Sequence, residues 1–412
     1  MSNTLLTPQM VTKEAVALWK NSNAFLQKID RQYSDQFARE GAKIGATINI
    51  RKPASYVVTD GPALSIQNAV QTQTPLTVSK QRHVDIAFTS AEQALSLMEF
   101  SELHLKPAIS NLAANVAADV MSLANTVPNL VGKGMTIGSS TGTLATPDAT
   151  TFNNARAQLM MNSTPPGDLN AIMDYQTDAR TANALSGLFN PTGRISQIFD
   201  SGEVRGPALG IANWWSDQTV QVTATGTYSA MPTVNGANQT GSTITVNAGT
   251  GNLNVGDIVT FAGVYAVNPL TFLSTGQLKQ FVVTAAYSGG TTLSIYPALT
   301  PIALTSGLNT VQYANCTASP ANSAAISTAL PSNTSYRKNL VMHKTAFTMA
   351  TVDLPLYGQG VIAAHRESFD GVSLRFLQAY DAQNDRAITR IDILYGYAAL
   401  MPERACVVAD VL

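Results

Sequence analysis

The sequence predicts an α+β protein that carries a separate all-β segment. Three observations lead to this prediction: an alanine-rich amphipathic stretch at 107–125, runs of alternating apolar and polar residues on both sides of it, and an almost uncharged, strand-rich segment at 218–336. The chain has 412 residues, enough for two domains with a sizeable core. We therefore expect an α+β host into which a β domain is inserted.

Composition and charge exclude several classes of protein. The net charge is −1, with 25 basic and 26 acidic residues, so no basic surface for nucleic acid or anionic lipid is expected. Charged residues make up only 12%, about half of the usual quarter, which favours a surface that neighbouring molecules cover. No apolar run is long enough to span a membrane, and the first residues lack the apolar core of a signal peptide. Cys316 and Cys406 lie far apart, and we favour free thiols over a disulfide.

From the N-terminus, residues 8–22 have the spacing of a short amphipathic helix. Residues 43–52 and 84–88 alternate in the manner of half-buried strands. The polar residues 53–80 between them predict a long extended hairpin or arm, and loops of this length usually have a function. A capping-box pattern predicts a further short helix over 90–98.

The stretch 107–125 is the strongest helix signal in the chain. Pro107 suits a first helical turn, and apolar residues then recur three and four positions apart. The expected buried face consists of Ile109, Leu112, Val116, Val120 and Leu123. Asp119 falls off this face, so its exchange for Asn should have little effect on stability. We expect a sheet to lie on this helix.

After a glycine- and threonine-rich connector at 131–147, the pattern becomes helical again over 148–162. A continuous apolar run at 169–174 predicts a buried strand. Two more short helices are expected in 178–189 and 193–200. These elements would belong to the α+β host.

The segment 218–336 differs sharply from its surroundings, because Asp257 and Lys279 are its only charged residues. Turn residues separate strand-like runs at 219–224, 242–247, 257–263, 280–285 and 291–296. This spacing is typical of a small sandwich or barrel. Its expected core consists of Phe261, Phe281, Val283, Leu293 and Ile295. Residues 315–333 have the composition of a return linker.

The host resumes with strand-like patterns at 338–351, 371–380 and 386–409. Within the last of these, Gly396 and Pro402 are expected to break the chain before a final strand at 405–408.

The sequence contains no recognisable catalytic, cofactor-binding or metal-ligating motif. The four histidines have no zinc-site spacing, and no phosphate-binding or nucleophile motif occurs. His365–Arg366–Glu367 could form an acid–base cluster, but a solvated loop is the better interpretation. Asp381, Asp385 and Asp392 resemble a carboxylate group, but the pattern of a calcium loop is missing and a turn is the better interpretation. We interpret Trp214–Trp215 as packing at a domain junction rather than as a ligand platform.

Three classes of function remain. A self-assembling structural protein is favoured by the low charge, the long arm and the inserted β segment. A binding or adhesive module, for glycans or another surface, could use the β segment. An enzyme with an unrecognised site is the least favoured class.

Three stretches carry a resemblance to a known family: Leu112–Asn125, Gly256–Val264 and Arg390–Val408. With the order of the elements, they make the chain similar to the major capsid proteins of tailed phages. More narrowly, it resembles the coat proteins of short-tailed Salmonella-type phages, which carry an insertion domain within a Hong Kong 97-type fold. One departure is that the insertion loop 229–241, often charged in this family, is uncharged here.

The resemblance implies a division of the chain into named parts. They are an N-arm (1–35), a peripheral domain (36–129) with an extended loop (about 50–82) and a spine helix (about 103–126), an axial domain (130–217 and 337–385), the inserted β domain (218–336) and closing peripheral strands (386–412).

The implied function is assembly of an icosahedral shell from pentamers and hexamers of this chain. A scaffolding protein, a portal, a possible decoration protein and non-specifically contacted double-stranded DNA are the implied partners. The resemblance also implies assembly in the bacterial host cytoplasm, a final location in the virion, and no cofactor, metal or enzymatic activity.

Overall fold

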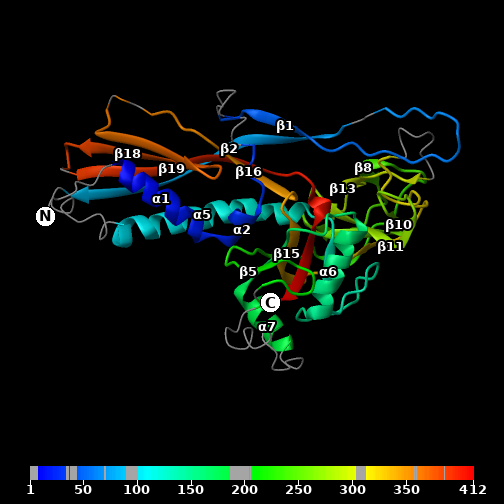
Figure 1. Cartoon of the computed structure of the whole chain (residues 1–412). Helices are drawn as coiled ribbons and strands as arrows, with labels where there is room; N and C mark the ends of the chain where they lie inside the picture. The colour runs from blue at the N-terminus through cyan, green and yellow to red at the C-terminus, as the bar shows by residue number, and fades with distance from the viewer. Residues whose placement is uncertain are drawn as a thin grey trace. The chain divides into compact units, whose positions relative to one another are not determined.

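The computed structural model describes residues 8–33, 37, 44–68, 71–89, 101–185, 204, 206–302, 312–356, 358, 360–384 and 386–412 (Figure 1). The chain divides into two units. Unit 1 comprises Met1–Ile50, Gln73–Val120 and Phe347–Leu400, and unit 2 comprises Arg51–Thr72, Met121–Ala346 and Met401–Leu412. Each unit is therefore built from three stretches that are distant in sequence.

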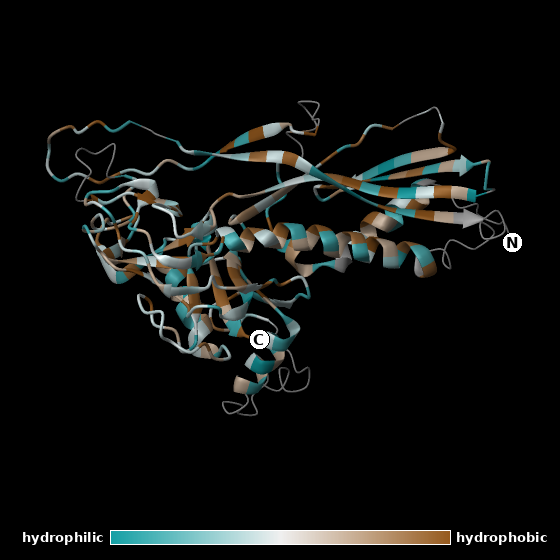
Figure 2. Ribbon diagram, turned by 180° about the vertical axis from the view of Figure 1, so that it is seen from behind, coloured by the Kyte–Doolittle hydropathy of each residue, from teal (hydrophilic) through white to brown (hydrophobic). Residues whose placement is uncertain are grey.

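Unit 1 contains a six-stranded antiparallel sheet in the order β1-β2-β19-β18-β17, with β16 also paired to β19. Its strands are β1 (Thr47–Arg51), β2 (Gln73–Thr89), β16 (Phe347–Val352), β17 (Ala363–Phe369), β18 (Val372–Asp381) and β19 (Arg386–Ala399). Figure 2 shows hydrophobic and hydrophilic residues alternating along these strands, the pattern of a sheet with two different faces.

The helices of unit 1 begin with α1 (Pro8–Ser22), which packs against β17 and β18, and α2 (Ala24–Lys28). The side chain of Asn23 caps α2 by accepting a hydrogen bond from the Leu26 amide at 3.0 Å. The long helix α5 (Lys106–Met121) follows a π-helical turn, η2 (Ser101–Leu105), and tightens into the 3₁₀ turn η3 (Ser122–Thr126). The expected helices at 8–22 and 107–125 are thus present.

Unit 2 contains a second six-stranded sheet in the order β3-β20-β15-β4-β5, with β6 also paired to β15. Its strands are β3 (Leu130–Gly132), β4 (Leu169–Met173), β5 (Asn213–Ser216), β6 (Val222–Ala224), β15 (Ser335–His343) and β20 (Ala405–Val411). The pairs β3–β20 and β4–β5 are parallel. Helices α6 (Ala149–Met161) and α7 (Tyr175–Leu185) belong to this part, and the Phe152 and Trp214 rings meet edge to face at 4.9 Å.

The segment 218–336 folds into two small antiparallel sheets within unit 2. One has five strands in the order β14-β10-β11-β13-β8, and the other has three in the order β12-β9-β7. The strands are β7 (Tyr228–Ala230), β8 (Gly241–Thr245), β9 (Thr250–Leu253), β10 (Ile258–Val267), β11 (Ser274–Val283), β12 (Tyr287–Ser288), β13 (Thr292–Leu299) and β14 (Ile326–Thr328). Its first predicted strand, 219–224, instead contributes β6 to the larger sheet.

Three expectations about boundaries are wrong. The predicted arm ends earlier than residue 80, because β2 already begins at Gln73 and runs for 17 residues. The predicted linker 315–333 contains β14, in which Ile326 pairs with Phe261. The closing strands of 386–412 do not share one sheet, since β19 lies in the sheet of unit 1 and β20 in that of unit 2. The helices expected at 90–98 and 193–200 lie outside the described residues.

Candidate assembly surfaces

The arm between β1 and β2 is largely exposed over its described residues. Its base is closed by a hydrogen bond from the Lys52 amide to the Thr72 carbonyl oxygen at 2.8 Å. Farther out, the Gln67 side chain accepts from the Val57 amide at 2.8 Å and donates to the Val57 carbonyl oxygen at 2.5 Å.

Beyond this clamp the tip of the arm presents apolar side chains to solvent. The exposed fractions are 89% for Val58, 88% for Leu64 and 78% for Ile66. Single exposed apolar residues are common on proteins, but three on one short loop form a surface that gains free energy when it is covered. The tip is therefore a candidate contact with another molecule.

The predicted face of the long helix is buried at four of its five positions. Ile109, Leu112, Val116 and Val120 are each at most 3% exposed. Leu123 is only half-buried, because the chain tightens into η3 at Ser122 and the α-helical period ends there.

Asp119 lies off the apolar face of α5, but its contacts argue against the expectation that Asp119→Asn has little effect on stability. Its carboxylate accepts hydrogen bonds from Lys80 Nζ at 2.9 Å, Arg82 Nε at 2.7 Å and the Tyr395 hydroxyl at 2.5 Å. Burial acts to raise the pKa of Asp119, but these donors outweigh it and hold the pKa at about 2. Asp119 therefore links α5 to β2 and β19. No signal in the local sequence identifies these partners, because they lie far away along the chain.

A buried ion pair lies inside the same sheet. The side chain of Asp392 is fully buried and accepts from Arg375 Nε at 3.0 Å and from Gln81 Nε2 at 2.9 Å. The structure thus separates Asp392 from Asp381, two of the three aspartates that the sequence placed near one another. Asp381 is bonded to Arg386 and Asn384 in an exposed turn, and Asp385 lies outside the described residues.

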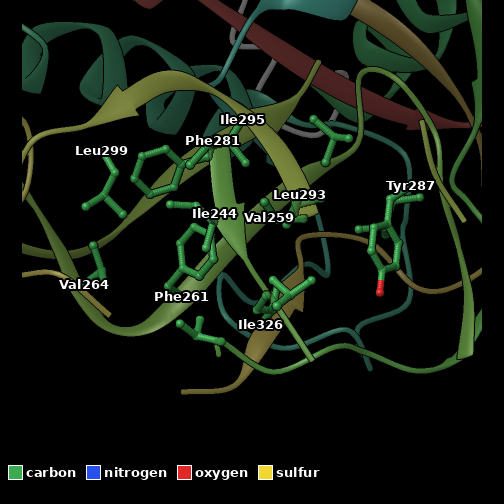
Figure 3. Packing of buried hydrophobic residues seen from close by; sticks show 14 of the residues in the cluster. Ile244, Val259, Phe261, Val264, Phe281, Tyr287, Leu293, Ile295, Leu299 and Ile326 are labelled. Atoms are coloured by element: carbon green, nitrogen blue, oxygen red, sulfur yellow. The ribbon is translucent and has the colours of Figure 1, made fainter. Parts of the chain in front are cut away.

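The β segment has a core of its own, shown in Figure 3. The five residues expected at its centre, Phe261, Phe281, Val283, Leu293 and Ile295, all lie in one cluster and are at most 1% exposed. The Phe261 and Phe281 rings meet edge to face at 5.4 Å. Cys316, from the predicted linker, also belongs to this cluster, and both it and Cys406 are free thiols.

Both charged residues of the β segment are buried rather than solvated. Asp257 is 3% exposed and accepts from the amides of Gly226 at 3.0 Å and Asn254 at 2.8 Å. Burial raises its pKa. Lys279 is 7% exposed, and burial lowers its pKa against the opposing effect of Glu403.

Lys338 on β15 connects the larger sheet of unit 2 to the turn that precedes β10. Its Nζ donates to Asn125 Oδ1 at 2.7 Å and to the Gly256 carbonyl oxygen at 3.2 Å. Gly256 has a φ of +92°, and a side chain there would meet Lys338 and Asn125. Burial lowers the pKa of Lys338 to about 8, although Asp257 opposes the shift.

Among the described residues, no group of three or more His, Cys, Asp or Glu side chains could hold a metal ion. None of the described helices is both long and apolar enough to cross a membrane. Trp214 is buried in the hydrophobic core beside α6, where the pairing with Phe152 accounts for it as a packing residue.

An arm whose tip exposes apolar side chains is typical of a protein that assembles with other protein chains. A family model described as "P22 coat protein - gene protein 5" matches residues 2–408. The chain therefore belongs to the P22 coat protein family. It is a structural major capsid protein of a phage, which self-assembles into the capsid of the virion. The adhesive-module alternative is not favoured.

Solved phage capsids also resemble the chain. A chain from Mycobacterium phage Che8 is 11% identical, with a TM-score of 0.47, 94% of this chain covered and 90% of that one. A chain from the capsid of cyanophage P-SCSP1u is 11% identical, with a TM-score of 0.42 and coverages of 90% and 84%. The CUS-3 coat protein I-domain is 39% identical, with a TM-score of 0.18, 26% of this chain covered and 96% of that domain. A search of the curated proteins finds no match.

Proposed function

We propose that this capsid protein has the Hong Kong 97-type fold with an inserted β domain. Unit 1 supplies the peripheral domain with α5 as its spine, and the larger sheet of unit 2 belongs to the axial domain. Residues 347–400 are assigned to the peripheral domain, since β16 to β19 pair within the sheet that contains β2. The N-arm remains assigned to residues 1–35.

The proposed inserted domain corresponds to 218–336. It is supported by its core, whose buried members all lie between Val234 and Ile326 and so need no residue from the rest of the chain. The strand β6 at its start and the hydrogen bonds of Lys338 to Asn125 and Gly256 would join it to the host.

The observation that carries the assembly mechanism is the apolar tip of the arm. We infer that residues 51–72 of one copy cover a surface of the next copy within pentamers and hexamers. A scaffolding protein and a portal would guide closure in the host cytoplasm, and a decoration protein could bind the finished shell. Packaged double-stranded DNA would be contacted without specificity, because the chain is nearly neutral.

The test replaces the apolar tip without shortening the arm. The triple variant Val58→Ser, Leu64→Ser and Ile66→Ser should fold, with a wild-type circular dichroism spectrum, and should lose most shells in negative-stain electron microscopy. Val255→Ser, which changes a residue that is 48% exposed elsewhere, is the matched control and should assemble normally. Shells at wild-type yield from the triple variant would refute the role of the arm.

A further inference from the structure

Among the described residues, strand β17 is an unpaired edge of the sheet in unit 1. It pairs with β18 along its whole length, from Ala363 opposite Gln378 to Phe369 opposite Val372, and it stands last in the strand order. No proline and no bulge interrupts this pairing, so one side of the strand presents backbone donors and acceptors.

The turn after β17 determines which residues face outward. Asp370 and Gly371 both have positive φ, 53° and 73°, as in a two-residue type I′ hairpin. In such a hairpin the flanking residues, Phe369 and Val372, form a hydrogen-bonded pair, and pairs of this kind recur at every second residue. The backbone groups of Ala364, Arg366 and Ser368 therefore point away from β18. None of them has a hydrogen-bond partner among the described residues.

Three polar side chains, His365, Arg366 and Glu367, follow one another in β17. Arg366 is already satisfied, by Asp353 at 3.2 Å and by the Leu354 carbonyl oxygen at 3.0 Å. His365 and Glu367 are half-buried on the other face of the strand, and Glu367 has no hydrogen bond or ion pair within the described chain. His365 Nδ1 is buried without a partner, which leaves Nε2 as its available group.

We propose that β17 pairs antiparallel with β17 of a second copy across a two-fold axis, an interface beyond the contact proposed for the arm. Outward residues must pair with outward residues, so Arg366 meets Arg366, and Ala364 meets Ser368 of the second copy. This register places His365 opposite Glu367 of the second copy, and the two-fold axis repeats that pair.

The side chains of His365 and Glu367 favour this register over its neighbours, because only here does each of them meet a complementary group. A shift of two residues in one direction places Glu367 opposite Glu367, and the opposite shift places His365 opposite His365. Charged residues on an edge usually oppose strand addition, but here they are complementary in one symmetric arrangement. The Arg366 pair adds little repulsion, because Asp353 neutralises each guanidinium. The strand that pairs with this edge belongs to a second copy of the chain. The chain self-assembles, and β17 itself carries both members of the complementary pair, His365 and Glu367.

Cysteine cross-linking tests the register directly. In the proposed pairing, positions 365 and 367 of two copies form a non-hydrogen-bonded pair with Cα atoms about 4.5 Å apart, which a disulfide can bridge. Shells co-assembled from His365→Cys and Glu367→Cys chains should give a disulfide-linked dimer on a non-reducing gel after mild oxidation. Shells of either variant alone should give less than about a tenth of that dimer. The native Cys316 and Cys406 are buried and should not contribute.

Equal cross-linking in single-variant shells, or no dimer in mixed shells, would overturn the proposal. If the cysteine variants do not assemble, a second pair of variants tests whether the outward edge of β17 is needed for assembly. Ala364→Pro removes an outward amide that no intramolecular bond uses, and should reduce shell yield at least tenfold while the chain stays folded. Ala364→Ser keeps that amide and should assemble normally. Equal shell yields from the folded Pro and Ser variants would also overturn it.

Discussion

The sheet of unit 1 and the β segment at 218–336 are both antiparallel but use charge in opposite ways. In unit 1, Asp392 and Asp119 are buried or nearly so, and each is held by several donors. In the β segment the core contains no charged residue, and the two charged residues of the segment, Asp257 and Lys279, are buried outside that cluster. Directional charged contacts therefore orient α5 on its sheet, whereas shape and apolar area hold the β segment together.

This difference has consequences for stability. A charged contact depends on pH and ionic strength and is lost when one partner is removed. An apolar core depends on neither, but a cavity in it is costly. Four substitutions measure how far this contrast holds.

The largest effect is expected in the apolar core. Phe261→Ala removes a ring that is 0% exposed, and the lost packing and the resulting cavity should cost about 3–5 kcal/mol. Urea unfolding of the full chain, followed by near-ultraviolet circular dichroism, measures this cost, which should be the same at low and high salt. Tyr265→Ala, in the same strand at 42% exposed, is the control and should cost far less. Equal costs would show that the core is not organised around Phe261.

The next effect concerns the buried lysine beside the β segment. The pKa of Lys338 falls from 10.5 to about 8 on folding, so between these values the unfolded chain binds the extra proton. Stability should therefore rise with pH across this interval, by about 3 kcal/mol in total. Below about pH 8 the full burial penalty applies.

Lys338→Met should lack this rise, whereas Lys13→Met, at an exposed position of α1, should retain it. Urea midpoints at pH 8 and pH 10 measure the difference between the two variants. An unchanged rise in Lys338→Met would mean that Lys338 is already protonated and solvated in the folded protein.

Asp119, which links α5 to β2 and β19, should contribute less to the free energy of unfolding than Lys338 changes it. This contribution is lost at low pH, whereas the penalty from Lys338 is relieved at high pH. The pKa of Asp119 falls from 3.8 to about 2 on folding, which corresponds to about 2 kcal/mol of stability. This contribution is complete above the unfolded pKa and disappears as the pH falls through about 2. Asp119→Asn should therefore be less stable than wild type at pH 6, and the gap in melting temperature should narrow towards pH 2. A gap that stays constant with pH would contradict the ionic origin.

The smallest effect is expected at a surface ion pair of unit 1. Arg31 and Asp370 lie 2.8 Å apart, but the Asp370 side chain is 51% exposed, and exposed pairs contribute little. Asp370→Asn should cost under about 0.5 kcal/mol, because Asn also tolerates the φ of 53° at this turn. A cost close to that of Asp119→Asn would remove the distinction between buried and exposed charges in unit 1.

Local patterns in the sequence were sufficient for the elements that depend on local geometry. The three- and four-residue spacing from Ile109 to Val120 predicted both the helix and its buried face. Alternation in 291–296 likewise predicted β13 and the burial of Leu293 and Ile295. Such periods arise from 3.6 residues per helical turn and two per strand, so they can be read in any short window.

Partner choice was decided only in the tertiary structure. From its local sequence Asp119 is expected at the surface, but in the fold β2 and β19 place Arg82 and Tyr395 beside it. Ile326 lies in a stretch with the composition of a linker, but in the fold it pairs with Phe261. The assignment of β19 and β20 to different sheets is of the same kind. The sequence by itself thus determined which segments are helical or extended and which faces are apolar. Which segments meet was settled by packing between residues far apart along the chain, and no local pattern records those contacts.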